Sequence, residues 1–248
     1  MPYQIPKNVR LPRKITPCPI EEAIVEIRFG LQQHIPEDAV FGLVFSAIGK
    51  DFPKVEKLQI LELPSQIRST DENLKYRPHY RLQNEKYILQ IGPRVVSLVA
   101  KRPYQGWGDF FPNLKKSFSS IQELKIIDSI KRLGLRYIDY FDTKVFDNVN
   151  LSITVNKESM VTPETQLRTT LKEGMFNILL QVTNNAVVSF EGKTKSGSVL
   201  DLDIFLEKFE GNFFEKYEEL IEDAHELEKR LFFSLLKEEF LKTLQPEY

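Results

Sequence analysis

The sequence predicts an α+β fold made of two consecutive, mostly antiparallel sheet-plus-helix units with a long C-terminal helix. Its 248 residues are 42% hydrophobic and 11% aromatic, which is enough to bury a sizeable core. Short apolar segments alternate with short polar turns, a pattern typical of antiparallel hairpins. Longer segments repeat apolar residues every three or four positions, as helices that cover a sheet do.

The chain is expected to divide into a basic, proline-rich arm over residues 1–19, a first unit over 20–142 and a second unit over 143–248. The arm contains five prolines, which forbid a helix and favour an extended backbone. Its basic residues have no acid beside them: Lys7, Arg10, Arg13 and Lys14. Two interpretations stay open, a solvated flexible arm and an arm that docks on a partner or a phosphate backbone.

The first unit opens with a strand over residues 23–29, whose charged residues lie two apart and so share one face. A helix follows over 40–48. Further strands are expected at 57–63, 80–83, 87–91, 95–99 and 126–141. Between the last two strands, a helix over 107–124 carries an unusually aromatic stripe, so we expect Trp107 to be buried between that helix and the sheet.

The second unit is expected to contain strands at 150–155, 166–172, 175–183, 186–191 and 199–206, with a hairpin turn at Asn184 and Asn185. A final helix over 213–244, capped by Asn212, would span about 48 Å at about 1.5 Å per residue. That is longer than a small domain is wide. We therefore predict that its end contacts a second copy or another protein, through Phe232, Leu235 and Leu236, although covering the sheet is an equal alternative.

The charges nearly cancel, with 34 Lys and Arg against 35 Asp and Glu, but they are unevenly placed. Residues 1–124 carry 18 basic and 13 acidic side chains, and the remainder carry 16 and 22. A set of basic residues on neighbouring strands and turns is predicted to gather on one sheet surface: Arg77, Arg81, Arg94, Lys101, Arg102, Arg132 and Arg136, with Tyr140 beside them. Such a surface either binds nucleic acid or is a solvated face paired with acids of the second half.

Four segments together resemble a sporadically distributed bacterial family of uncharacterised proteins of this size. They are residues 19–29 (PIEEAIVEIRF), 104–107 (YQGW), 133–139 (LGLRYID) and 202–204 (LDI), and the resemblance covers nearly the full length. It implies a cytosolic bacterial protein encoded in mobile or accessory loci such as phage-defence islands. It supplies no catalytic residue, and it implies asparagine in many relatives where this chain has Asp139.

No motif in the sequence points to catalysis. The stretch that begins at His225 resembles a zinc-protease motif but has Lys229 where the second histidine ligand must stand, so we expect no metal there. Cys18 lies between two prolines with no base nearby, and there is no phosphate-binding loop. Asp201 and Asp203 are expected about 7 Å apart on one strand face, either solvated or holding a metal as a hydrolase would.

The sequence therefore favours a non-enzymatic component that binds a protein partner or assembles with itself, in an accessory or phage-defence locus if the resemblance holds. The alternative is a nucleic-acid binding or sensing module that uses the basic first half, and a metal-dependent hydrolase ranks last. We expect no cofactor and no metal. The apolar runs are too short to cross a bilayer, no secretory signal is recognisable, and a single cysteine fits the reducing cytoplasm.

Overall fold

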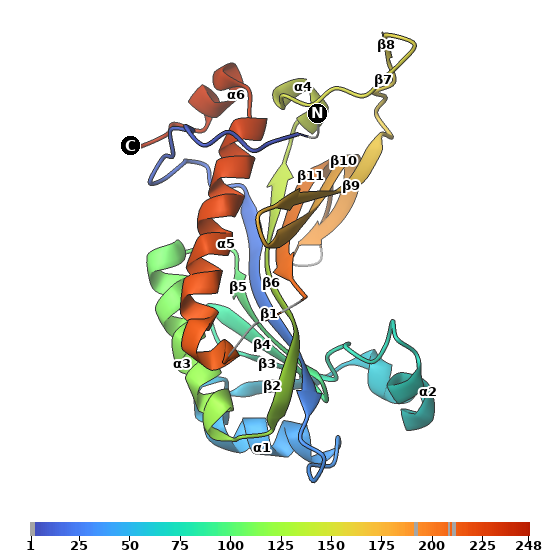
Figure 1. Cartoon of the computed structure of the whole chain (residues 1–248). Coiled ribbons are helices and arrows are strands. Elements are labelled where there is room, and N and C mark those ends of the chain that lie inside the picture. The colour runs from blue at the N-terminus through green and yellow to red at the C-terminus, as the bar shows by residue number, and fades with distance from the viewer. Residues whose placement is uncertain (1–2, 191–192, 208, 210–211) are drawn as a thin grey trace. The chain divides into compact units, whose positions relative to one another are not determined.

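The structure, a computed structural model, describes residues 3–190, 193–207, 209 and 212–248. It combines helices with a large antiparallel sheet, which confirms the α+β class (Figure 1). Within the described residues, no helix is both long and apolar enough to cross a membrane.

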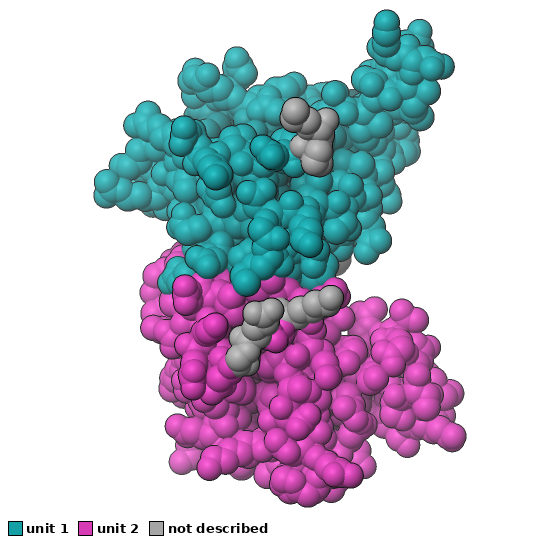
Figure 2. All heavy atoms as spheres, in the orientation of Figure 1, with its two compact units in different colours: residues 1–21, 136–205, 221–248 teal, residues 22–135, 206–220 magenta. Residues whose placement is uncertain are grey.

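Two compact units make up the chain, and each is assembled from separated segments (Figure 2). Unit 1 contains residues 1–21, 136–205 and 221–248, and unit 2 contains residues 22–135 and 206–220. The units therefore interleave along the sequence, whereas the expected boundary at residue 142 would place one after the other. Strand β6 (Ile127–Phe141) and helix α5 (Phe213–Leu235) each contribute residues to both units, which is why no linker marks a boundary.

Unit 2 places six strands in the order β2-β3-β4-β5-β1-β6. Besides β6, these are β1 (Ile20–Leu31), β2 (Lys54–Lys57), β3 (Tyr80–Gln83), β4 (Tyr87–Gly92) and β5 (Val95–Lys101). Its helices are α1 (Ala39–Ile48), α2 (Ser65–Thr70) and α3 (Trp107–Glu123), with 3₁₀ turns at Gly49–Asp51 and Gln59–Glu62. The strand expected at 57–63 is thus wrong, because β2 ends at Lys57 and a 3₁₀ turn follows.

The core of unit 2 follows from two periodicities. Alternate residues of β1 are fully buried, from Ala23 to Phe29, as a strand with one covered face requires. Helix α3 buries Phe110, Leu114 and Phe118 at spacings of four residues, so one stripe of the helix faces the core.

Unit 1 orders its strands β6-β11-β10-β9, with β9 (Gln166–Glu173), β10 (Phe176–Phe190) and β11 (Lys193–Leu206). Its other elements are α4 (Val145–Asn148), the small hairpin of β7 (Thr154–Val155) and β8 (Glu158–Ser159), and α6 (Glu238–Thr243). The strand expected at 199–206 is confirmed within β11. The hairpin expected at Asn184 and Asn185 is wrong, since β10 continues through both with a bulge, while residue 191 of the expected next strand lies outside the described residues.

The C-terminal helix is shorter than expected, and the residue after it pairs with another segment of unit 1. Asn212 Oδ1 accepts a hydrogen bond from the Phe214 N–H at 3.2 Å, which confirms the expected cap. Helix α5 stops at Leu235, and Leu236 forms a β-bridge with Val149 before α6 begins. The Asn150 N–H donates to the Leu235 carbonyl at 2.6 Å, so this bridge anchors the helix end within unit 1.

The three side chains predicted to contact a partner belong to the core instead. Phe232, Leu235 and Leu236 are only 5%, 5% and 4% exposed. The expectation assumed an overhanging helix, but α5 ends at Leu235, where the chain pairs with residues 149 and 150 of the same unit. The predicted partner-binding surface is therefore corrected to an intramolecular packing surface of unit 1.

The proline-rich arm is also tied down by its own unit. The backbone N–H groups of Arg13 and Thr16 donate to the carbonyls of Glu247 and Leu244, both at 2.6 Å. The Arg10 guanidinium lies 3.6 Å from the centre of the Tyr248 ring, a cation–π contact. Residues 10–16 are therefore docked on the C-terminal segment, which replaces the flexible-arm interpretation for this stretch.

Candidate binding site

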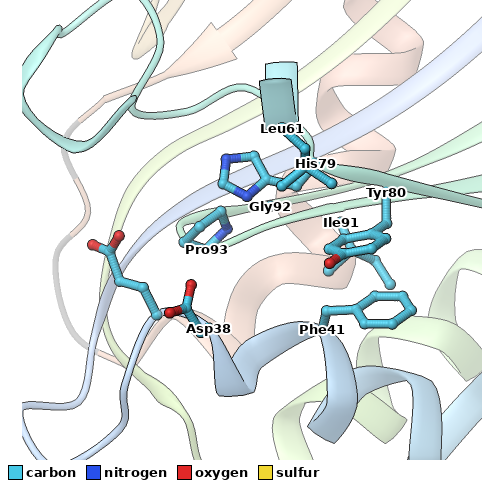
Figure 3. A pocket seen from close by; sticks show the side chains of 9 residues that line it. Asp38, Phe41, Leu61, His79, Tyr80, Ile91, Gly92 and Pro93 are labelled. Carbon is cyan, nitrogen blue, oxygen red and sulfur yellow. The ribbon is translucent and has the colours of Figure 1, made fainter. Parts of the chain in front are cut away.

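Unit 2 contains an open pocket of about 180 Å³ where the start of α1 approaches β3 and β4 (Figure 3). Its lining combines two carboxylates, one histidine and several apolar or aromatic groups: Glu37, Asp38, Phe41, Leu61, His79, Tyr80, Ile91, Gly92 and Pro93. A concave site with a mostly apolar lining and a few polar groups is the usual form of a binding pocket.

Stacked aromatic rings form one wall. Phe41, in the first turn of α1, stacks on Tyr80 at the start of β3 with the ring centres 3.8 Å apart. Phe45, one helical turn later, stacks on Phe41 at 5.7 Å and is 41% exposed. The aromatic wall therefore continues from the pocket onto the surface.

The opposite side is fixed by backbone hydrogen bonds around His79. Its N–H donates to the Ile91 carbonyl at 2.8 Å, and its carbonyl accepts from the Leu58 N–H at 2.9 Å. These bonds hold the 3₁₀ turn that carries Leu61 beside β4. Gly92 allows the backbone at Arg77 to approach β4 closely, because a Cβ at position 92 would lie 2.5 Å from the Arg77 carbonyl oxygen.

One of the two carboxylates of the pocket has no ion-pair partner among the described residues. Glu37 Oε1 accepts from Arg94 Nε at 2.9 Å, so its charge is shared. Asp38, the residue before α1, makes no capping hydrogen bond and has no ion-pair partner among the described residues. Burial lowers the pKa of His79, and the neighbouring Arg68 lowers it further, which favours a neutral ring at neutral pH.

The predicted basic residues are brought to the sheet, but most of them are paired with carboxylates. The pairs are Arg81 with Glu56 (3.3 Å), Arg94 with Glu37 (2.9 Å), Arg132 with Glu26 (3.1 Å) and Arg136 with Asp201 (2.6 Å). Lys101 Nζ donates to the Asn84 carbonyl at 2.5 Å, and Arg77 and Arg102 are exposed. Tyr140 is buried. Among the described residues, four of the seven predicted basic side chains are therefore neutralised by a neighbouring carboxylate.

The pair of Arg132 and Glu26 explains a glycine. A Cβ at Gly134 would lie 2.2 Å from Arg132 Nη1, so the arginine lies flat over Gly134 on its way to Glu26. Arg132, a predicted nucleic-acid contact, thus forms an ion pair on the sheet with Glu26.

In unit 1, Asp201 holds Arg136 in place and is not a solvated carboxylate. Arg136 donates to both oxygens of Asp201 at 2.8 and 2.6 Å, and Gln181 Nε2 donates to Oδ2 at 2.9 Å. Asp201 is only 6% exposed, which corrects the expected solvated face. Within the described residues, no group of three or more His, Cys, Asp or Glu side chains could hold a metal.

Unit 1 also buries acids that the sequence did not predict to be buried. Asp139 is 1% exposed, and neither of its carboxylate oxygens has a hydrogen-bond partner among the described residues. Burial raises the pKa of Asp139 well above its usual range, and the nearby Asp201 and Glu21 raise it further. Burial likewise raises the pKa of Glu228, which is also affected by Asp139.

The same interior contains His225, whose pKa burial lowers to about 3, with a smaller contribution from Lys229. Its Nδ1 lies 3.2 Å from Tyr137 Oη, a hydrogen bond between α5 and β6. Burial thus disfavours the charged form of all three groups, since it raises the pKa values of Asp139 and Glu228 and lowers the pKa of His225. We interpret this interior as core.

Trp107 is half-buried at the start of α3 and not enclosed as expected. It stacks on Phe111 at 5.0 Å and meets Phe110 edge-on at 5.9 Å. We expect its fluorescence to be quenched by acrylamide to an intermediate degree, and Trp107→Ala to cost about 1–2 kcal/mol in urea unfolding, less than the about 3–5 kcal/mol of a fully buried aromatic. Phe110→Ala is the matched buried control. An equal loss of stability in both variants would show Trp107 to be core.

Sequence reasoning missed the pocket, although a signal was present. Acidic residues just before a helix and an aromatic residue in its first turn place charge beside an apolar surface, as Asp38 and Phe41 do. The residues on the other side of the pocket, His79 and Tyr80, lie where the sequence predicts only a short strand at 80–83.

Comparison of the chain with protein-family models and with curated proteins finds no match.

Proposed function

We propose that this protein is a protein-binding module whose pocket in unit 2 receives a lysine or arginine side chain of a partner protein. The observation that carries the proposal is the Asp38 carboxylate, which has no ion-pair partner among the described residues and lines the same pocket as the stacked Phe41 and Tyr80 rings. The methylene stem of a basic side chain packs on aromatic faces while its charged head reaches a carboxylate. No cofactor or catalytic group is needed for this role.

The surroundings support a protein as the source of that side chain. Phe45 extends the aromatic wall out of the pocket and is 41% exposed. A free amino acid that fills the pocket would leave Phe45 uncovered, whereas a protein would cover it. The proposal retains the cytoplasmic, non-enzymatic role expected from the sequence. Membership of an accessory or phage-defence locus rests on the family resemblance alone.

Nucleic-acid binding is not adopted as a second function. Counterion release requires cations that are free to meet phosphates, and the paired arginines would first have to leave Glu26, Glu56 and Asp201. We expect only weak, salt-sensitive affinity for DNA or RNA.

The pocket is tested by titrating the ¹⁵N-labelled protein with N-acetyl-arginine amide and N-acetyl-lysine amide, followed by NMR. We expect dose-dependent shifts of the Phe41, Ile91 and Gly92 amides. Asp38→Asn should weaken binding about threefold to fivefold, the size of a partly exposed ion pair. Glu85→Gln removes the same charge from the exposed β3–β4 turn and should leave affinity unchanged.

N-acetyl-norleucine amide provides the uncharged comparison. If it binds as tightly as the lysine derivative, the pocket recognises only an apolar chain and the proposal is wrong. Shifts that avoid the pocket, or none at all with either basic derivative, would also reject it.

A further inference from the structure

Strand β9 forms one margin of the sheet in unit 1 (Figure 1). It pairs with β10 on one side, and no other strand of the described chain pairs with its second side. The side chains alternate between exposed and half-buried along all eight residues. An edge of this length offers a row of backbone donors and acceptors to another strand.

The backbone groups that point outward can be assigned from the β9–β10 turn. Gly174 and Met175 form a two-residue turn, with Gly174 at φ 57°, so Glu173 and Phe176 close it as a hydrogen-bonded pair. Hydrogen-bonded and non-bonded pairs alternate from there. The outward N–H and C=O groups therefore belong to alternate residues: Gln166, Arg168, Thr170 and Lys172. The Asn184 N–H bond to the Thr165 carbonyl at 3.0 Å agrees with this phase.

We propose that β9 pairs with β9 of a second copy of this chain, antiparallel, around a twofold axis at Thr169. This register places Gln166 opposite Lys172, and Arg168 opposite Thr170, as hydrogen-bonded pairs. On the other face it places Leu167 against Leu171. Apolar groups thus meet apolar groups and no like charges lie opposite each other.

The two neighbouring registers are less favourable, because each places like charges opposite each other. An axis at Thr170 would set Arg168 against Lys172, and an axis at Arg168 would set that residue against itself. Like charges directly opposite in a sheet are destabilising. Of the three registers centred on residues 168, 169 and 170, only the one at Thr169 places no like charges opposite each other and also sets Leu167 against Leu171. This match of the strand to its own sequence favours a second copy as the occupant.

The register is tested by oxidative cross-linking of full-length protein with Cys18→Ser, which removes the exposed native thiol. In this background, Thr169→Cys places two thiols in a non-bonded pair, where the Cα atoms lie about 4.5 Å apart and a disulfide fits. Thr170→Cys is the matched control, because its copies would be separated by more than a disulfide spans. We expect a covalent dimer from the first variant only.

A second test uses proline. The Thr170 N–H points outward, so Thr170→Pro removes an intermolecular donor without breaking the β9–β10 ladder. We expect light scattering to show a concentration-dependent rise toward twice the monomer mass for the native chain, and a monomer with native circular dichroism for this variant. A native chain that stays monomeric, equal cross-linking at positions 169 and 170, or an unchanged dimer in the folded proline variant would overturn the proposal.

Discussion

Replacing Asp139 with asparagine is expected to stabilise the protein, by an amount that grows as the pH rises. In the folded state the carboxyl is buried without a hydrogen-bond partner among the described residues, and burial raises its pKa. In the unfolded chain an aspartate has a pKa of about 3.9. Between these two values the folded state binds more protons than the unfolded state. The contribution of the protonated Asp139 carboxyl to the free energy of unfolding is therefore fully present below about pH 4. It is lost as the pH rises toward the pKa of Asp139 in the folded state.

The loss amounts to about 1.4 kcal/mol per pH unit for one such group. Asparagine has a similar shape and no charge, so Asp139→Asn removes this pH-dependent cost. Glu228→Gln should behave in the same direction, because burial raises the pKa of Glu228 too. The two substitutions are not expected to be additive, since Asp139 itself contributes to the raised pKa of Glu228.

The measurement is urea unfolding of the native chain and the variants between about pH 5 and pH 9. The difference in the free energy of unfolding between Asp139→Asn and the native chain should widen with pH. Asp142→Asn, at an exposed position three residues away, should change stability by less than about 0.5 kcal/mol. A constant difference, or a variant less stable than the native chain throughout, would show that Asp139 is not the buried, unpaired acid described above.

Local sequence patterns predicted the elements that obey one simple period. The alternation of β1 and β11 and the apolar stripe of α3 are visible in the sequence because each element buries one face. The sequence predicts a turn at Asn184 and Asn185, because both are typical turn residues, whereas β10 continues through them. In the fold, Asn184 Nδ2 instead donates to the Thr162 carbonyl at 3.2 Å, and a bulge absorbs the irregularity.

The site was harder to predict than the fold because its parts are distant in the sequence. Arg136 and Asp201 are 65 residues apart, and Arg132 and Glu26 are 106 apart, so nothing local distinguishes a paired arginine from a free one. The pocket likewise forms only because α1 contacts β3, and no periodicity in the sequence predicts that contact. The net charge of each half of the chain therefore did not predict which basic side chains are paired, because the pairing acids come from other segments.

The end of α5 provides the second large expected effect. Phe232→Asp with Leu236→Asp should abolish cooperative folding, because it places two charges at positions that are 5% and 4% exposed. The single variant Leu236→Ala keeps the effect measurable and should cost about 2–5 kcal/mol, the transfer and cavity terms of a buried leucine. Met175→Asp, at a 61% exposed apolar position, is the matched control and should stay within about 0.5 kcal/mol of the native chain.

Circular dichroism and light scattering together separate packing from association. If these side chains pack within unit 1, Leu236→Ala lowers the urea midpoint while the mass at a given concentration is unchanged. If instead they met a partner copy, the double aspartate variant would remain folded and only its mass would fall. The β-bridge between Leu236 and Val149 and the hydrogen bond from Asn150 to the Leu235 carbonyl favour the first result, because both hold the helix end against the unit's own α4 segment.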